Sequence, residues 1–143
     1  MEQIQKFNKE IEDLRKLKSN IHELRKIYDI INEEIIKDSL KQIIITSDNI
    51  YKEVMINTEK LDKIRNFNNY YIITIKKILN QYIKINEKKI RNEEAKKLCI
   101  KIETFIPNVS ESFKKVYDAL FEDDVIDIDS EIKVMMSQMK IED

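Results

Sequence analysis

The chain contains no glycine in 143 residues, and this absence limits its fold and chemistry more than any other feature. Glycine supplies the positive-φ backbone and the close approach that phosphate-binding loops, dinucleotide-binding turns, nucleophile elbows and tight hairpins need. Nucleotide enzymes built on those turns are therefore excluded. The single cysteine and single histidine also exclude a disulfide framework and a cysteine-based or histidine-rich metal centre.

Apolar residues in the first half of the chain recur at steps of three and four, which predicts a helix with one buried face. The stripe comprises Ile4, Phe7, Ile11, Leu14, Leu17, Ile21, Leu24, Tyr28, Ile31 and Ile35, then shifts by one residue and resumes with Ile36, Leu40, Ile43, Ser47, Ile50 and Val54. We interpret the shift as the drift of a straight helix against a seven-residue repeat, which favours one long helix over residues 1–57. The alternative is a break near Asp38-Ser39 or Thr46–Asn49, where short polar side chains can cap a new helix.

The second half predicts three more helices, after a turn near residues 56–58. A second stripe comprises Leu61, Ile64, Tyr71, Ile75, Ile78, Tyr82 and Ile85. Asn92, followed by two glutamates, predicts the start of a third helix, whose stripe comprises Leu98, Ile102, Ile106, Val109, Phe113, Val116 and Leu120. That stripe keeps its phase through Pro107, which favours a kinked helix over a new start at Asn108. A short amphipathic helix follows Asp127–Ser130.

No segment alternates apolar and polar residues over the length of a strand, so the predicted fold class is all-α. We expect one domain over residues 1–143, an elongated antiparallel helical bundle with coiled-coil character. It would consist of three long helices plus a short C-terminal helix. Residues 1–57 would form the long or broken N-terminal helix and residues 58–143 the rest of the bundle.

Charge is distributed in blocks along a chain whose net charge is −1. Residues 76–101 carry nine bases and three acids, whereas residues 102–143 carry four bases and eleven acids. The basic block could bind a nucleic-acid backbone, but a neutral pI favours lysines that solvate a helix surface. The first residues have no apolar signal segment and no stretch is long enough to span a membrane, so we expect a cytoplasmic protein without membrane contact.

Candidate chemistry is sparse, and each candidate has a structural alternative. His22 and Cys99 are the only pair for a nucleophilic dyad, but an exposed histidine and a buried thiol are the more common outcome. An acidic turn around Glu122–Glu131 offers oxygen ligands for Mg²⁺ or Ca²⁺, with Asp123, Asp124, Asp127 and Asp129 as the candidate metal ligands. Acids between two helices more often cap and solvate.

Two apolar clusters are candidates for contact with a ligand or a partner. Phe67, Tyr70, Tyr71 and Tyr82 could line an aromatic pocket, although their spacing is also that of a helix face in a core. The last helix carries an apolar, methionine-rich face that could bind a partner: Ile132, Met135, Met136 and Met139. Packing inside the bundle is again the simpler alternative.

The segment from residue 64 to residue 82 resembles the bacterial 5-bromo-4-chloroindolyl phosphate hydrolysis protein family. The family signature is leucine-arginine, then phenylalanine, then asparagine-tyrosine-tyrosine leading into a lysine-leucine-leucine helix; here it is carried by Phe67, Asn69, Tyr70, Tyr71, Lys77, Leu79 and Tyr82. A second block, residues 113–123 and 127–132, is followed by the methionine-containing helix. The likeness covers residues 20–143. Relatives tend to have a proline after the tyrosine pair, where this chain has Ile73.

The resemblance implies a link with cleavage of a chromogenic phosphate ester and with toxic-anion (tellurite) resistance proteins, but it brings no catalytic residues. We therefore expect a non-catalytic protein without cofactors. It would contact a helical partner, such as a toxic-anion resistance protein, or a second copy of itself. The alternative is a metal-dependent phosphoesterase that hydrolyses phosphate monoesters at the acidic turn.

Overall fold

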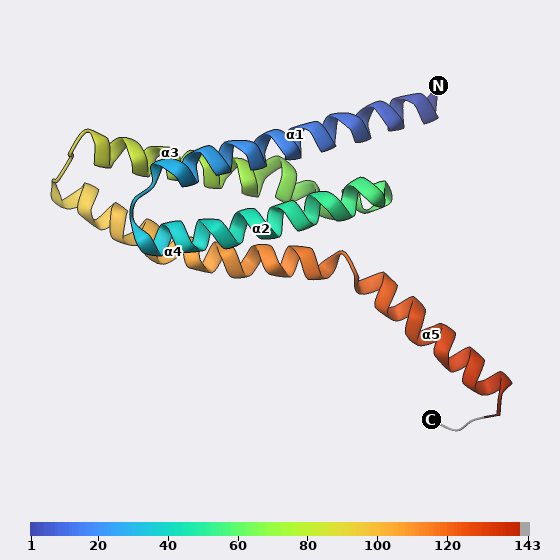
Figure 1. Cartoon of the computed structure of the whole chain (residues 1–143). Helices are drawn as coiled ribbons and strands as arrows, with labels where there is room; N and C mark the ends of the chain where they lie inside the picture. The colour runs from blue at the N-terminus through green and yellow to red at the C-terminus, as the bar shows by residue number, and fades with distance from the viewer. Residues whose placement is uncertain (141–143) are drawn as a thin grey trace.

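The computed structural model describes residues 1–140, and nearly all of them are helical (Figure 1). The α-helices are α1 (Glu2–Ile30), α2 (Glu34–Ile56), α3 (Ile72–Glu87), α4 (Glu93–Ala119) and α5 (Glu122–Gln138), with a 3₁₀ helix η1 (Thr58–Ile64) and a π-helix η2 (Phe67–Tyr71) between α2 and α3. The all-α prediction is confirmed. The division differs from the expected three long helices and one short one, because residues 1–57 form two helices.

Helices α1 to α4 form a bundle in which successive helices run in opposite directions (Figure 1). Helix α1 packs on α2 and α3, and α2 packs on α4, whereas α3 and α4 share the smallest contact around the bundle. Each of the four helices contributes side chains with no exposed surface to the core, including Leu24, Leu40, Leu79 and Ile106. The apolar stripes therefore meet inside a single core, and the seam between α3 and α4 is its loosest side.

The expectation of a continuous first helix is wrong, because the chain reverses at residues 31–33. Ile31 is extended (φ −72°, ψ 131°) and buried, and the Glu33 carboxylate accepts a hydrogen bond from the Ile36 amide at 2.8 Å as the N-cap of α2. The Lys37 ammonium donates to the carbonyls of Tyr28 and Ile31 at 2.7 and 3.3 Å, which satisfies the end of α1. The one-residue shift of the apolar stripe, from Ile35 to Ile36, is therefore a sign of this chain reversal and not of a drift within one straight helix.

Neither of the alternative break points is a break. Asp38-Ser39 and Thr46–Asn49 both lie within α2, and the side chains of Thr46 and Ser47 are buried there. Two other predicted boundaries agree with the structure: α2 ends at the Asn57 cap, and the Asn92 side chain caps α4 by accepting a hydrogen bond from the Ala95 amide at 2.9 Å. The second predicted helix instead begins as η1 and η2, and α3 itself starts only at Ile72. Pro107 lies inside α4, which does not restart at Asn108.

Some residues predicted to be buried are exposed. Ile4 and Phe7 lie on the part of α1 that extends beyond the other helices of the bundle (Figure 1). Tyr71 is the last residue of η2, directly before α3, and Leu98 lies on α4. Both lie at the seam where α3 and α4 share little contact, and they are 44% and 43% exposed. Within residues 1–140, no helix is long and apolar enough to cross a membrane.

Candidate interaction surfaces

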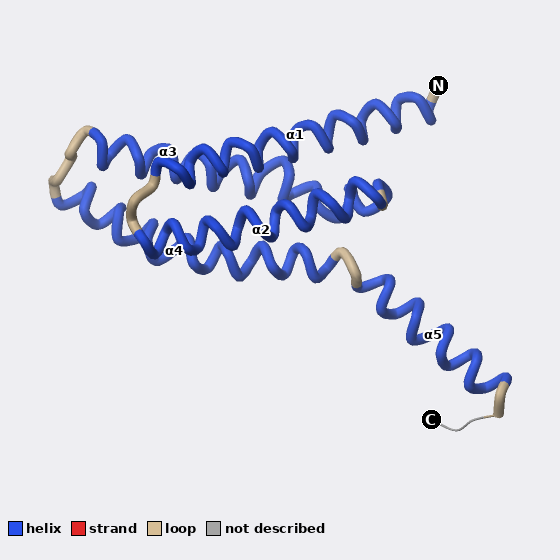
Figure 2. The backbone as a smooth tube through the Cα atoms, in the orientation of Figure 1, coloured by secondary structure: helices blue, strands red, loops and turns tan. Residues whose placement is uncertain are grey.

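Helix α5 leaves the bundle as a separate arm (Figure 2) and buries none of its residues. Five apolar residues along the arm, the last of them the C-cap residue of α5, recur at steps of three and four and remain half or more exposed: Val125 67%, Ile128 56%, Ile132 52%, Met135 61% and Met139 54%. We call this set the arm seam. It repeats every 3.5 residues on average, which is the period of a helix that packs along another helix. Met136 lies beside the seam and is partly buried. The predicted partner-binding residues therefore lie on an open helix face.

The acidic residues form the first turns of α5 instead of the turn predicted before it. The side-chain carboxylates of Glu122, Asp123 and Asp124 interact favourably with the helix dipole, which explains why α5 begins at Glu122 and not after Asp127–Ser130 as predicted. Asp123 and Asp124 bind Lys63 and Lys60 at 2.8 and 2.7 Å.

The four candidate metal ligands do not share one face of α5. Asp129 lies two residues after Asp127, so it projects from nearly the opposite side of the helix, where it pairs with Lys133 at 3.0 Å. Asp123 and Asp124 already have lysine partners. Within the described residues, no group of three or more His, Cys, Asp or Glu side chains has a geometry that could hold a metal ion.

The arm is anchored to the bundle through Lys60 of η1, which sequence reasoning missed. The Lys60 ammonium donates to Glu53 and Asp124, both at 2.7 Å, and lies 4.6 Å from the centre of the Phe121 ring. Its side chain is 9% exposed. The hydrogen bonds to Asp124 and Glu53 raise the pKa of Lys60, and the hydrogen bond from Lys60 lowers the pKa of Glu53. No local sequence pattern identifies this cluster, because its members come from three separate segments.

Acidification is expected to release the anchor of α5. Hydrogen bonds from Lys60 and Lys63 lower the pKa values of Glu53 and Asp123 below their ordinary values of 4.5 and 3.8. A carboxyl group with a lowered folded-state pKa stabilises the folded form above its unfolded pKa, and that contribution is lost as the pH falls through the folded pKa. The anchor should therefore be complete above about pH 5 and weaken below about pH 4.

Pulsed EPR distances between spin labels on η1 and α5, in a Cys99→Ser background, would measure this release. The distance distribution should broaden as the pH falls below about 4, while far-UV circular dichroism shows that the bundle is still helical. An unchanged distribution in acid would contradict the assignment of these two carboxylates to the anchor.

An apolar groove runs along the seam between α3 and α4. Its larger part, about 830 Å³, has Ile78, Leu98, Ile102 and Phe105 as its apolar lining residues, and Lys77 and Lys101 are among its polar lining residues. A second part, about 410 Å³, continues along the same seam through the shared residues Thr74, Phe105 and Asn108 to Tyr70, Tyr71 and Val116. We call the two parts together the α3–α4 groove.

The groove could have been found in the sequence from a second apolar face on α4. Leu98 and Phe105 are seven residues apart, so they lie on the same side of the helix two turns from one another. Both are more than 40% exposed, whereas Ile102 and Ile106 of the main stripe are buried. The predicted core stripe includes Leu98 and leaves Phe105 without a role, because one stripe is sufficient to explain the helix.

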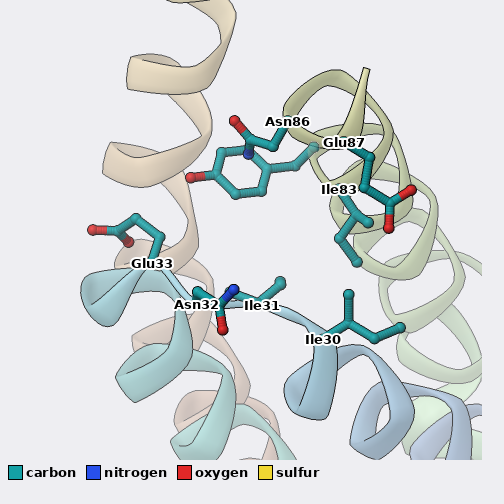
Figure 3. Close-up of a pocket in the computed structure, with 8 residues that line it drawn as sticks. Ile30, Ile31, Asn32, Glu33, Ile83, Asn86 and Glu87 are labelled. Carbon is teal, nitrogen blue, oxygen red and sulfur yellow. The ribbon is translucent and has the colours of Figure 1, made fainter. Parts of the chain in front are cut away.

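A third pocket lies where the α1–α2 connection faces the end of α3 (Figure 3). It has a volume of about 480 Å³ and its polar lining side chains are Asn32, Glu33, Asn86, Glu87 and Tyr82. The Tyr82 hydroxyl donates to Glu103 at 3.1 Å, and burial followed by the Glu103 charge raises the pKa of Tyr82 to about 12. A phenol held neutral in this way is a weak nucleophile and base. This pocket offers no activated group.

The His22–Cys99 pair is not arranged as a dyad. His22 is exposed on α1, and Cys99 is half-buried on α4, a helix with which α1 makes little contact. Burial raises the pKa of the Cys99 thiol, which reduces its thiolate fraction and hence its nucleophilicity. The described residues thus place the two candidates apart.

Residues 3–135 match the family model of the 5-bromo-4-chloroindolyl phosphate hydrolysis protein. The chain belongs to this family. The match confirms the resemblance carried by the tyrosine-containing segment and extends it toward the N-terminus, from residue 20 to residue 3. No curated protein and no solved structure matches the chain.

The signature residues of the 5-bromo-4-chloroindolyl phosphate hydrolysis family are divided between the core and the groove. Phe67, Leu79 and Tyr82 are buried, and Phe67 packs edge-to-face on Phe113 at 4.8 Å between ring centres. Asn69 accepts a hydrogen bond from Lys16 of α1 at 2.7 Å. Tyr70, Tyr71 and Lys77 are exposed and line the α3–α4 groove. Some signature residues therefore pack in the core, and others form one wall of the α3–α4 groove.

Proposed function

We propose that this member of the 5-bromo-4-chloroindolyl phosphate hydrolysis family is a non-catalytic contact protein whose α5 arm binds a helical partner. The observation that carries the proposal is the arm seam: five apolar side chains in a helix that buries none of its own residues. Isolated helices of this length are marginal in water, so packing against another surface would stabilise the arm. The family's association with toxic-anion resistance proteins makes such a protein the candidate heterologous partner.

The side-chain chemistry of the described residues supports a binding role over phosphate hydrolysis. Three of the four aspartates proposed as metal ligands are paired with lysines, and the thiol has a raised pKa. A metal-assisted hydrolase needs several carboxylates that converge on one ion. The arm presents its carboxylates around a helix instead.

The purified chain is expected to release no product from 5-bromo-4-chloroindolyl phosphate above the no-protein rate with Mg²⁺, Mn²⁺ or Ca²⁺. The Asp127→Asn variant should behave identically, because Asp127 has no catalytic role in this proposal. Colour development, followed for hours at high protein concentration, is the measurement. Turnover that purifies with the chain and disappears in Asp127→Asn would overturn the proposal in favour of a phosphoesterase.

Binding to a purified toxic-anion resistance protein tests the contact role. Ile132→Glu places a charge in the middle of the arm seam and should weaken binding at least about tenfold. Ser130→Glu adds the same charge to the opposite face of α5 and is the matched control, expected to bind as the wild type does. Equal binding by both variants would exclude the arm seam as the contact surface.

A further inference from the structure

The α3–α4 groove has the dimensions of a receptor for one amphipathic helix. On α4 it extends from Leu98 to Val116, and eighteen steps of 1.5 Å make about 27 Å. Helix α5 has 17 residues and is about 25 Å long by the same measure. Two packed helices form a groove along their seam, and an apolar face laid into such a groove is a common mode of helix recognition.

We propose that the α5 arm of one copy docks in the α3–α4 groove of a second copy, so that two chains exchange arms. This inference rests on the proposed function of the arm and identifies the surface that receives it. A reciprocal exchange gives a twofold dimer with two identical arm–groove contacts. Each contact covers the arm seam and the exposed side chains of Leu98 and Phe105.

Charge complementarity supports the groove as the receptor. Helix α5 carries six acids and one lysine, and residues 76–101, which include Lys77 and Lys101 of the groove, carry nine bases and three acids. Two arms paired with one another would instead bring together two helices that both carry net negative charge, which is unfavourable. The groove therefore fits the arm better than a second arm does.

A second copy fits better than the chain's own arm. The start of α5 is held against η1 by Lys60 and Lys63, and from there α5 points away from the bundle (Figure 1). For the arm to reach its own groove, the chain would have to reverse at Leu120-Phe121 and break both ion pairs. The arm of a neighbouring chain needs neither change.

Sedimentation equilibrium of the full chain and two single variants tests the exchange. Wild type should dimerise, and the dimer should weaken with added salt. Ile132→Glu in the arm and Phe105→Glu in the groove should each weaken the dimer at least about tenfold. Ser130→Glu on the far face of α5 and Ile100→Glu, at an exposed α4 residue outside the groove, are matched controls that should dimerise normally. Circular dichroism verifies that each variant is folded.

An equimolar mixture of Ile132→Glu and Phe105→Glu should recover part of the dimer, because one arm–groove contact in the mixed pair is intact. A wild type that stays monomeric at about 100 µM overturns the proposal, since a contact weaker than that range leaves the arm free. Loss of the dimer in Ile132→Glu but not in Phe105→Glu indicates arm–arm pairing and also overturns it.

A cysteine pair separates a second copy from the chain's own arm. In a Cys99→Ser background, Leu98→Cys combined with Ile128→Cys should form disulfides between chains under mild oxidation. A disulfide within one chain would overturn the proposal. If the dimer is absent and Ile132→Glu still loses the heterologous partner, the proposed function stands without the exchange. If Ile132→Glu changes neither, the proposed function fails as well.

Discussion

Replacing Phe67 by alanine is expected to lower the free energy of unfolding by about 3–5 kcal/mol, the range for removing a buried phenylalanine ring. Phe67 is 2% exposed and packs edge-to-face on Phe113, with an angle of 72° between the rings. It also begins the π-helix η2, so the cavity would open where the chain changes from 3₁₀ to α-helical geometry. Urea unfolding followed by circular dichroism at 222 nm measures the loss.

Tyr70→Ala is the control from the same signature segment. Tyr70 is 62% exposed, so its removal should change stability by no more than about 0.5 kcal/mol. Phe113→Ala completes a double-mutant cycle, in which the two rings should couple by about 0.5–1.5 kcal/mol. A loss below about 1 kcal/mol in Phe67→Ala would show that this ring does not support the core.

Lys60→Met is expected to lower stability by about 1–3 kcal/mol and to free the arm. The substitution keeps much of the apolar stem and removes the ammonium that binds Glu53 and Asp124. It leaves the mostly buried Glu53 carboxylate without its cation. Removing one partner of a fully buried pair costs more than this, and the partly exposed carboxylates reduce the penalty here. Urea unfolding gives the stability, and EPR distances between η1 and α5 give the freedom of the arm.

Lys63→Met is the matched control for Lys60→Met. Lys63 pairs with the largely exposed Asp123, so its loss should leave stability within the error of the measurement. Glu53→Gln combined with Lys60→Met should be less than additive, because the two residues share one interaction. If Lys60→Met and Lys63→Met behave alike, Lys60 is not the anchor.

Loss of the Lys60 anchor should change the orientation of the arm without changing the residues that form the dimer contact. Lys60→Met alters no residue of the arm seam or of the α3–α4 groove. A freed arm samples more directions, so it loses more conformational entropy on docking, and some of those directions allow it to approach its own bundle. The cysteine pair at positions 98 and 128 would report such a change as a higher proportion of disulfides within one chain.

The sequence was sufficient to predict features that depend on a few neighbouring residues. Helix and not strand followed from the three-and-four spacing of apolar residues, and the start of α4 followed from Asn92, whose side chain caps the helix. The passage of α4 through Pro107 followed from an apolar stripe that keeps its phase on both sides. In each case the residues that form the pattern lie within about two helical turns of the feature that they predict.

The hairpin between α1 and α2 could not be located from apolar spacing and capping residues. Its N-cap is Glu33, a weaker cap than the serine and asparagine that drew attention to later positions. Ile31 is buried within the reversal, so the apolar stripe passes through it with only a one-residue shift. The anchor at Lys60 was out of reach for a different reason, because it joins residues up to 64 positions apart.

What the sequence determined by itself is the main apolar stripe of the core helices, the end of α2 and the start of α4, since these depend on local spacing and capping. Only the tertiary structure decided which apolar faces are covered. Ile106 and Phe105 are neighbours of similar hydrophobicity, yet one is fully buried and the other is 44% exposed. The difference arises because burial requires a second surface opposite the side chain. That surface exists for the core stripe of α4, whereas the arm seam and the α3–α4 groove have none within a single chain.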